Sequence, residues 1–450
     1  MRIGQIAIDT TPLRTSKDFR LLFIGRVVTQ AGNAIAMTAA NWQIFGLTHS
    51  SLAVGLLTLA DSVGMFAGLL VGGVLADHND RRKVMLAART PLVALAALLV
   101  LNSLLAHPLL WLIYVLVAGM GTLSGFASPA STAAIPAVIS SDQMPAAAAL
   151  SAMSGQLGTL GGPALAGILI AGPGLPVCYG IDTACLAIFG VTLYFLRPLP
   201  PSGGGIVPPG QHGATSRPGL RSLAEGLRYV LSNPVVAGML AVDTSAMIFG
   251  MPAALFPAIA RDHFHGGSAT FGLLVAAPAL GAIIGAVTSG WTGRLRRPGV
   301  VVIFAGLAWG AAIVGFGLST SLILGLVFLA LAGMSDLVSE VLRNSLLQIY
   351  TPDALRGRAT SLYLAQVTTA PSIGNVEAGV VAQLVSTTFS VVSGGLICVA
   401  GALLLGVLNP ALRRAKFSGP EPADAVSAND GPVDPDPTGG APPDGQQVPA

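Results

Sequence analysis

Long apolar runs recur along most of the chain. A helix needs about 20 predominantly apolar residues to cross the hydrocarbon core of a bilayer, and windows of that length give twelve candidate spans. Only 10% of the residues are charged, compared with about 25% in a typical soluble domain. The sequence therefore predicts an all-α membrane protein with twelve transmembrane helices, which begin near residues 20, 52, 84, 110, 146, 176, 234, 269, 299, 322, 358 and 389.

One long connection divides the candidate spans six and six. Residues 197–232 contain the proline- and glycine-rich stretch RPLPPSGGGIVPPGQHG, a composition typical of a flexible linker. We expect an N-terminal six-helix half over residues 1–196 and a C-terminal six-helix half over residues 233–416. Residues 417–450 are rich in proline, glycine and aspartate and contain no basic residue, so we expect a disordered tail.

Lysine and arginine gather on one side of the predicted spans. If the N-terminus is inside, 19 of the 23 basic residues fall in inside segments, and only Arg261 falls in an outside loop. Cytoplasmic loops of membrane proteins carry such an excess. The first 20 residues are charged and lack an apolar core, so no cleavable signal peptide is expected. The sequence predicts a multi-pass protein of the inner (cytoplasmic) membrane with both termini in the cytoplasm.

The two halves share an internal repeat. When the sequence is shifted by 217 residues, segment 54–77 aligns without a gap on segment 271–294, and seven of the 24 positions are identical. Gly64 and Gly68 have the small-xxx-small spacing that allows close helix contact, as do their counterparts. Convergence between two glycine-rich helices is the alternative explanation. Two parallel six-helix repeats are typical of transporters that expose a central site alternately to each side.

Three charges interrupt one apolar helix. The stretch LAGMSDLVSEVLRNSLLQ, residues 331–348, carries Asp336, Glu340 and Arg343 at steps of four and three, which places them on one helix face. A charge at the bilayer centre costs about 2.5–3.5 kcal/mol even on insertion scales. We therefore expect this face to line a wet pathway for substrate and protons.

Two explanations of these charges remain open. Glu340 and Arg343 can simply pair, and Arg343 can also reach the membrane surface with its long side chain. Asp336 lies nearer the middle of the helix and is expected to have no basic neighbour on it. Asp336 is therefore the preferred candidate for the proton carrier.

Other polar side chains at membrane depth are candidates for the same pathway. Arg26 and Asp61 lie on adjacent helices and can also form a structural pair, and Asp243 takes the position of Arg26 under the 217-residue shift. Asp182 can be merely interfacial. Such carboxyl groups can bind and release protons as access alternates. The full set of pathway candidates is Arg26, Gln30, Asn33, Asp61, Asp243, Asp336, Glu340 and Glu377.

The arrangement resembles the major facilitator superfamily. That superfamily has a loop motif between its second and third helices, Gly-x-x-x-Asp-Arg/Lys-x-Gly-Arg-Arg/Lys, and the stretch GVLADHNDRR matches it at Gly73, Asp77, Arg81 and Arg82. His78 and Asp80 depart from the motif. The resemblance implies a gating role for these residues, and the basic cluster also sets the topology.

A second motif lies in the fifth predicted helix. The stretch GTLGGPALAG resembles the antiporter motif Gly-x-x-x-Gly-Pro-x-x-Gly-Gly and matches it at Gly158, Gly162, Pro163 and Gly167, whereas Ala166 departs. Proline removes a backbone hydrogen bond and glycine permits bending and tight packing, and a kink for packing alone is the alternative. In the superfamily this motif accompanies export. The arginine of the superfamily's fourth-helix motif is absent from VLVAGMGTLSGFASP.

Within the superfamily, the chain is most similar to the enterobactin exporter branch of bacterial siderophore efflux proteins. The similarity runs from about residue 12 to residue 412 and is carried by VGGVLADHNDRRKVMLAAR, MFAGLLVGG, THSSLAVGL, AAPALGAIIGAVTSG and SLLQIYTPDALRGRATSLYLAQ. The resemblance implies a proton-coupled exporter of a catecholate siderophore. A multidrug or macrolide efflux antiporter of the same fold is the alternative, although the low aromatic content, 6%, favours a polar substrate.

Other classes of function have little support. The chain contains no GxSxG, HExxH or Walker loop, so we expect neither an enzyme nor the use of ATP. His263 and His265 lack a third ligand, and we expect no metal, other cofactor or nucleic-acid partner. A scaffold acting through the acidic tail would lose its function on deletion of residues 417–450. The expected partners are a small-molecule substrate, protons and the lipid bilayer, with the protein acting as a monomer.

Overall fold

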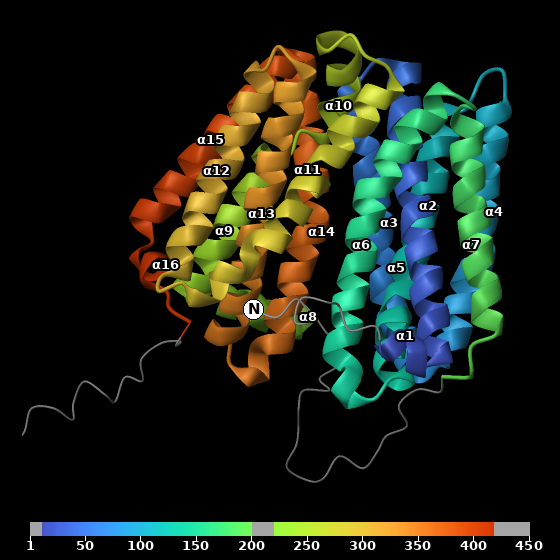
Figure 1. The fold of residues 1–450 in the computed structure, drawn as a ribbon, viewed down its shortest axis with the longest axis horizontal. Helices are drawn as coiled ribbons and strands as arrows, with labels where there is room; N and C mark the ends of the chain where they lie inside the picture. The colour runs from blue at the N-terminus through green and yellow to red at the C-terminus, as the bar shows by residue number, and fades with distance from the viewer. Residues whose placement is uncertain (1–10, 200–219, 418–450) are drawn as a thin grey trace, which may run out of the picture.

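Two bundles of long helices lie side by side (Figure 1) in the computed structural model, which describes residues 11–199 and 220–417. The N-terminal bundle consists of α1 (Thr11–Thr15), α2 (Lys17–Thr48), α3 (Ser51–His78), α4 (Arg81–Leu104), α5 (Leu110–Val138), η2 (Ser141–Gln143), α6 (Met144–Ala171) and α7 (Leu175–Tyr194). The C-terminal bundle consists of α8 (Leu220–Ser232), α9 (Pro234–Phe249), η3 (Ala253–Leu255), α10 (Phe256–Ala258), η4 (Ile259–His263), α11 (Ser268–Thr288), η5 (Ser289–Arg294), α12 (Pro298–Leu318), α13 (Leu322–Tyr350), α14 (Asp353–Leu384), α15 (Thr387–Leu408) and α16 (Pro410–Arg414).

Each predicted span begins close to the start of a long helix. The largest difference is five residues, between the predicted start near residue 358 and Asp353, where α14 begins. Within the described residues, nine helical segments are both long and apolar enough to cross a membrane. The other long helices, α2, α6 and α14, have 32, 28 and 32 residues, or about 42–48 Å at 1.5 Å per residue. The prediction of an all-α membrane protein is confirmed.

The two ends of the molecule differ in charge. We call the end where α2 begins and α3 finishes the basic end, because Arg82, Arg197, Arg297, Arg356, Arg358, Arg413 and Arg414 lie there. The opposite end is the one where α2 finishes at Thr48 and α3 begins. Between the two ends, the outer surface exposes large apolar side chains such as Val63, Leu331 and Leu396, which are 60%, 43% and 54% exposed. Such a surface is suited to lipid rather than to water.

Glycine contacts hold neighbouring helices together within each half. A Cβ atom on Gly68 of α3 would lie 1.9 Å from the Thr122 carbonyl oxygen of α5, and one on Gly281 of α11 would lie 1.7 Å from the Ala330 oxygen of α13. Lipid provides no hydrophobic force between helices, so association depends on such close backbone approach. The second helix of each half thus packs on the fourth in the same way, as the internal repeat requires.

The end of the predicted linker is helical. Of residues 197–232, those from Leu220 to Ser232 form α8. Glu225 forms an ion pair with Arg358 of α14, and the Tyr229 hydroxyl donates a hydrogen bond to the Tyr350 carbonyl oxygen. These contacts fasten α8 to the C-terminal half at the basic end. Residues 200–219 and the tail, 418–450, lie outside the described residues.

The seventh span is broken near the opposite end. Helix α9 finishes at Phe249, and the chain continues through η3 and α10 into the π-helix η4. Pro252 lacks a backbone N–H and interrupts the helical ladder, and the Trp309 indole Nε1 donates to the Gly250 carbonyl oxygen at 3.0 Å. The break places Met251 and Phe256 beside the space between the two bundles.

Candidate functional site

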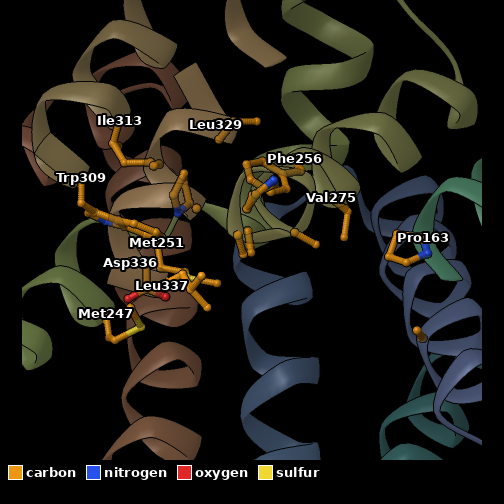
Figure 2. A pocket seen from close by; sticks show the side chains of 18 of the residues that line it. Pro163, Met247, Met251, Phe256, Val275, Trp309, Ile313, Leu329, Asp336 and Leu337 are labelled. Atoms are coloured by element: carbon orange, nitrogen blue, oxygen red, sulfur yellow. The ribbon is translucent and has the colours of Figure 1, made fainter. Parts of the chain in front are cut away.

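A cavity of about 440 Å³ lies between the two halves. Its volume is within the range of small-molecule sites. Figure 2 shows Asp336, Trp309 and Met251 on the side of the C-terminal half, with Pro163 of α6 across from them. The lining residues are Ala34, Met37, Thr38, Asn41, Pro163, Met247, Met251, Pro252, Ala253, Phe256, Val275, Pro278, Ala279, Ala282, Trp309, Ile313, Leu329, Ala332, Gly333, Asp336, Leu337 and Glu340.

Apolar and aromatic groups make up most of this lining. Trp309 and Phe256 supply flat faces, and three methionines supply flexible ones. The charged lining residues are two acids, Asp336 and Glu340, and the lining contains no lysine, arginine or histidine. The polar character expected from the sequence is therefore confined to a small part of the cavity.

An ion-pair network lies behind the cavity lining of α13. The Arg343 Nη2 atom is 2.9 Å from Asp243 Oδ1 of α9 and 3.4 Å from Asp336 Oδ1, and Arg343 Nη1 donates to Ser339 Oγ at 2.6 Å. Arg343 and Asp243 are 4% and 1% exposed, whereas the Asp336 side chain is 32% exposed. Arg343 thus connects a carboxyl group at the cavity to one buried in the C-terminal half.

Helix α14 completes the surroundings of the buried acid. The Gln366 side chain donates from Nε2 to Asp243 Oδ2 at 2.9 Å and to the Leu240 carbonyl oxygen at 3.2 Å. The Tyr363 hydroxyl lies beside the Arg343 guanidinium. Asp243 is therefore held by groups from both α13 and α14.

This arrangement differs from the sequence expectation in three respects. Asp336 does have a basic neighbour on its own helix, because the guanidinium of Arg343, two turns away, reaches back to it. Glu340 and Arg343, which both lie in the described part of the chain, do not form an ion pair with each other. Arg343 instead pairs with Asp243 and Asp336. Arg343 also does not reach the membrane surface, because it is almost fully buried.

The polar stripe on α2 is only partly gathered into one place. Gln30 and Asn33 are exposed and Arg26 is half-buried. Asn33 and Asp61 of α3 line a separate cavity of about 20 Å³ in the N-terminal half, which is enough for about one water molecule. The described residues Arg26 and Asp61 do not form the ion pair that was an open alternative. Glu377 lies on α14 beside the contact with α3 rather than near Arg343.

Asp182 is not interfacial. It is 1% exposed on α7, and its Oδ1 atom lies 2.9 Å from the point that a Cβ on Gly32 of α2 would occupy. Arg89 of α4 interacts electrostatically with Asp182 and stacks over the Phe189 ring at 4.4 Å from its centroid. Among the described residues, no group of three or more His, Cys, Asp and Glu side chains is arranged as metal ligands.

The loop between α3 and α4 fastens the N-terminal half at the basic end. Arg82 donates to the Leu193 and Tyr194 carbonyl oxygens at the end of α7, at 2.9 and 2.8 Å, where the helix dipole favours a cation. Arg81 donates from Nη1 to the Ala133 carbonyl oxygen of α5 at 3.1 Å. Gly73 has open space around it, and the Asp77 side chain lies outside the described part of the structure.

The glycines of the predicted antiporter motif face two helices. Cβ atoms on Gly158 and Gly162 would meet α2, at Gln30 and Ala34 respectively, whereas one on Gly167 would lie 2.7 Å from the Ser268 carbonyl oxygen of α11. Pro163 itself lines the cavity. Helix α6 therefore packs between its own half and the C-terminal half.

The halves touch each other from the opposite end to about mid-depth. Ser268 Oγ of α11 donates to the Gly167 carbonyl oxygen of α6 at 3.0 Å, and the ring of Trp42 stacks on that of Phe271 with centroids 5.5 Å apart. Arg261 Nη1 lies 2.9 Å from His49 Nε2. These contacts separate the cavity from the opposite end of the molecule.

Several lining residues could not be identified from the sequence. Trp309 lies within a uniformly apolar helix, and Met247, Met251 and Phe256 belong to an apolar run, so no polar signal marked them. Gln366 did carry a signal, because it is an amide within a predicted span, a position where polar groups usually have a partner.

Known proteins resemble this chain along nearly its whole length. Residues 8–433 match the family described as transmembrane secretion effector. The chain is 35% identical over 425 residues to the enterobactin exporter EntS of Escherichia coli O157:H7 (strain EC4115 / EHEC), covering 94% of this chain and 98% of that protein. It is equally similar, over 424 residues, to the enterobactin exporter of Shigella boydii serotype 18.

Solved structures share the fold at much lower sequence identity. A POT family transporter in complex with 5-aminolevulinic acid has a TM-score of 0.69 at 12% identity, covering 88% of this chain and 97% of that one. A bacterial homologue of the iron transporter ferroportin in an inward-facing state has a TM-score of 0.65 at 15% identity, covering 89% and 99%. These structures share the fold, and the family match over residues 8–433 with the 35% identity to enterobactin exporters shows that the chain belongs to the transmembrane secretion effector family of the major facilitator superfamily.

Proposed function

We propose that this protein exports an iron-free catecholate siderophore across the cytoplasmic membrane in exchange for protons. The observation that carries the proposal is the 35% identity to enterobactin exporters over 94% of the chain. The excess of arginine at the basic end supports an orientation in which that end and both termini face the cytoplasm. The multi-pass protein acts as a monomer in the inner membrane.

The cavity chemistry suits the iron-free form of such a substrate. Catechol rings are flat and can stack on Trp309 and Phe256, and their hydroxyl groups can donate to Asp336 and Glu340. The ferric complex of a tris-catecholate is an anion. A cavity with two carboxyl groups and no cation in its lining repels that anion.

Proton coupling is supported by the charge balance around Arg343. Arg343 pairs with Asp243 and Asp336, and Glu340 lies in the same cluster without an ion pair to it. One guanidinium cannot neutralise all three carboxyl groups. A buried carboxylate without a counter-charge is costly, and a proton or a cationic partner supplies the missing charge. We propose that Asp336 exchanges protons at the cavity and that Asp243 is its buried partner.

The lining also supports a second candidate function. The same pair of acids attracts a cationic amphiphile, and methionines and aromatic rings adapt to varied apolar shapes. A macrolide or multidrug efflux antiporter is therefore the alternative that this cavity supports.

Transport of iron-free enterobactin into inside-out membrane vesicles tests the proposal. With an acidified lumen, we expect uptake that a protonophore abolishes, because the proton gradient drives exchange through the cavity. Asp336→Asn is expected to reduce uptake to the level of vesicles without the protein, since it removes the acid that is proposed to exchange the proton. The ferric complex is expected not to enter.

The controls separate the two candidate functions. Ser335→Ala, next to Asp336, removes a hydroxyl that bonds only to its own helix at the Leu331 carbonyl, and it should leave uptake unchanged. Vesicles that exclude enterobactin but take up a cationic dye or a macrolide would overturn the siderophore proposal and favour drug efflux.

Alternating access in this protein requires the opposite end to open and close, and Gly272 lies in that contact. A Cβ at this position would lie 2.5 Å from the Pro163 carbonyl oxygen and 2.9 Å from Gly167 Cα. We expect Gly272→Ala to hold the halves apart at the opposite end. The atoms that the new methyl group would meet belong to the backbone of α6, which cannot move aside as a flexible side chain can. Spin labels on the two halves should report a longer distance, with uptake reduced and the melting temperature maintained.

The matched control for this change is Gly267→Ala, just before α11, where a Cβ would have no atom within 4 Å. It should resemble the unmodified protein in both measurements. Equal interspin distances in Gly272→Ala and Gly267→Ala would contradict a gate at this contact.

A further inference from the structure

Helix α14 contacts both the buried ion pair and the other half of the molecule. At one level, Gln366 donates hydrogen bonds to Asp243 Oδ2 and to the Leu240 carbonyl oxygen. Six residues further along, or about 9 Å, the Ser372 hydroxyl shares a hydrogen bond with the Ser62 hydroxyl of α3. A single helix thus joins the acid at position 243 to the interface between the halves.

The contact between α14 and α3 is built closely and continues toward the opposite end. A Cβ on Gly55 of α3 would lie 2.5 Å from the Asn375 carbonyl oxygen, and one on Gly379 would lie 2.7 Å from Leu52 Cα. The Asn375 Oδ1 atom accepts a hydrogen bond from the Ala254 backbone N–H at 2.9 Å. Because backbone meets backbone, a small shift or rotation of α14 breaks this contact rather than deforming it.

Between these two levels α14 contains Pro371. Proline has no N–H to donate to the carbonyl of Val367, so the helix is weakest between Gln366 and Ser372. We call residues 372–379 of α14, which contact α3, the gate segment. A change in how Gln366 is held therefore alters the angle at which the gate segment meets α3.

We propose that Gln366 is a positioning residue that links the charge on Asp243 to closure of the α3–α14 contact. The inference deepens the proposed exchange of protons and rests on it. The carboxylate of Asp243 holds the Gln366 amide by a charge-assisted hydrogen bond, and α14 then lies against α3, as in this structure. Protonation of Asp243 removes the charge that both Arg343 and Gln366 bind. The gate segment then loses its support, and the opposite end opens.

Among the residues that the structure describes, the titratable groups that face Asp243 come from two helices. Arg343, Asp336 and Glu340 face it from α13, and Tyr363 faces it from α14. Helix α12 packs against α9 and contains no titratable side chain, and Cys398 of α15 bonds to the Gly306 carbonyl oxygen. His49 lies beside Arg261 at the opposite end rather than beside Asp243, and it is replaced in the pH series below.

The test measures closure of the α3–α14 contact directly, at one fixed pH and without substrate. Spin labels are placed at His107→Cys and Thr320→Cys, two exposed positions in loops of the two halves at the opposite end, after replacement of the native cysteines. We expect Asp243→Asn, which mimics the protonated acid, to shift the closed-to-open ratio on the order of fivefold toward open. Gln366→Leu should produce a shift of similar size.

The decisive result is the double variant. If Gln366 acts through Asp243, combining Asp243→Asn with Gln366→Leu gives no larger shift than either change alone, whereas independent effects multiply. Gln366→Asn, whose shorter amide cannot reach the acid, replaces Gln366→Leu if the latter does not fold. Thr369→Val, one turn along α14, removes a hydroxyl that bonds only to its own helix and serves as the matched control.

A pH series in a His49→Gln background completes the experiment. Opening at acidic pH should be present with Gln366 and lost in Gln366→Leu. A multiplicative double variant, or a pH response that survives in Gln366→Leu, would overturn the inference while leaving the proposed export intact. If enterobactin is not taken up but the pH response still depends on Gln366, the proposed substrate is wrong and the link between Asp243 and the α3–α14 contact stands.

Discussion

Replacing Arg343 with methionine is expected to lower the free energy of unfolding by about 3–5 kcal/mol, the usual cost of removing one partner from a buried ion pair. The guanidinium lies 2.9 Å from the carboxylate of Asp243, and both residues are almost fully buried. Methionine fills a similar volume but leaves that carboxylate without a counter-charge. Thermal unfolding of the purified protein in detergent provides the measurement.

Two further variants identify the cause of this loss. Arg356→Met removes an arginine whose ion pair with Asp353 is largely exposed, and it should cost less than about 1 kcal/mol. Combining Arg343→Met with Asp243→Asn should restore part of the lost stability, because the deepest charge is removed along with its partner. An unchanged melting temperature in Arg343→Met would show that the network contributes nothing to stability.

Gly68→Val is expected to destabilise the N-terminal half by about 1–3 kcal/mol or more, the range for forcing extra atoms into a packed contact. The new Cβ would lie 1.9 Å from the Thr122 carbonyl oxygen and 2.9 Å from the Phe126 backbone nitrogen. These are backbone atoms of α5, so the two helices must separate. The lower melting temperature and the yield of folded protein measure the effect.

The matched control is Gly73→Val, on the same helix, where a Cβ would have no neighbour within 4 Å. Both changes place a β-branched residue in α3 and share its cost in helix propensity. Only the packing term differs between them. If the two variants melt at the same temperature, close packing of α3 on α5 does not stabilise the half.

Much of the architecture could be predicted from local sequence features. Apolar runs of sufficient length located the long helices because the bilayer imposes a minimum length on each span. The 217-residue repeat identified Gly68 and its counterpart Gly285, and the structure places both repeats in equivalent helix pairs. The helical segment Leu220–Ser232 was missed because its start follows directly on a proline- and glycine-rich stretch.

The candidate site was only partly predictable. The charges of residues 331–348 lie on α13, and two of them, Asp336 and Glu340, line the cavity. The partner of Arg343 was not identified, because Asp243 lies 100 residues earlier in the chain and no local pattern connects them. The aromatic and methionine lining was also missed, since such side chains are compatible with lipid as well as with a cavity.

The sequence by itself determined where the long apolar helices begin, the end that carries the arginines and the glycines at which neighbouring helices meet. Each of these follows from local composition and spacing. Only the tertiary structure decided which face of each helix turns inward, and therefore that Arg343 holds Asp243, that Gln366 reaches the same acid and that Trp309 lines the cavity. In lipid the outer and inner faces of a helix are both apolar, so hydrophobic periodicity does not distinguish them. Inward faces are selected by close packing between helices that are distant in sequence.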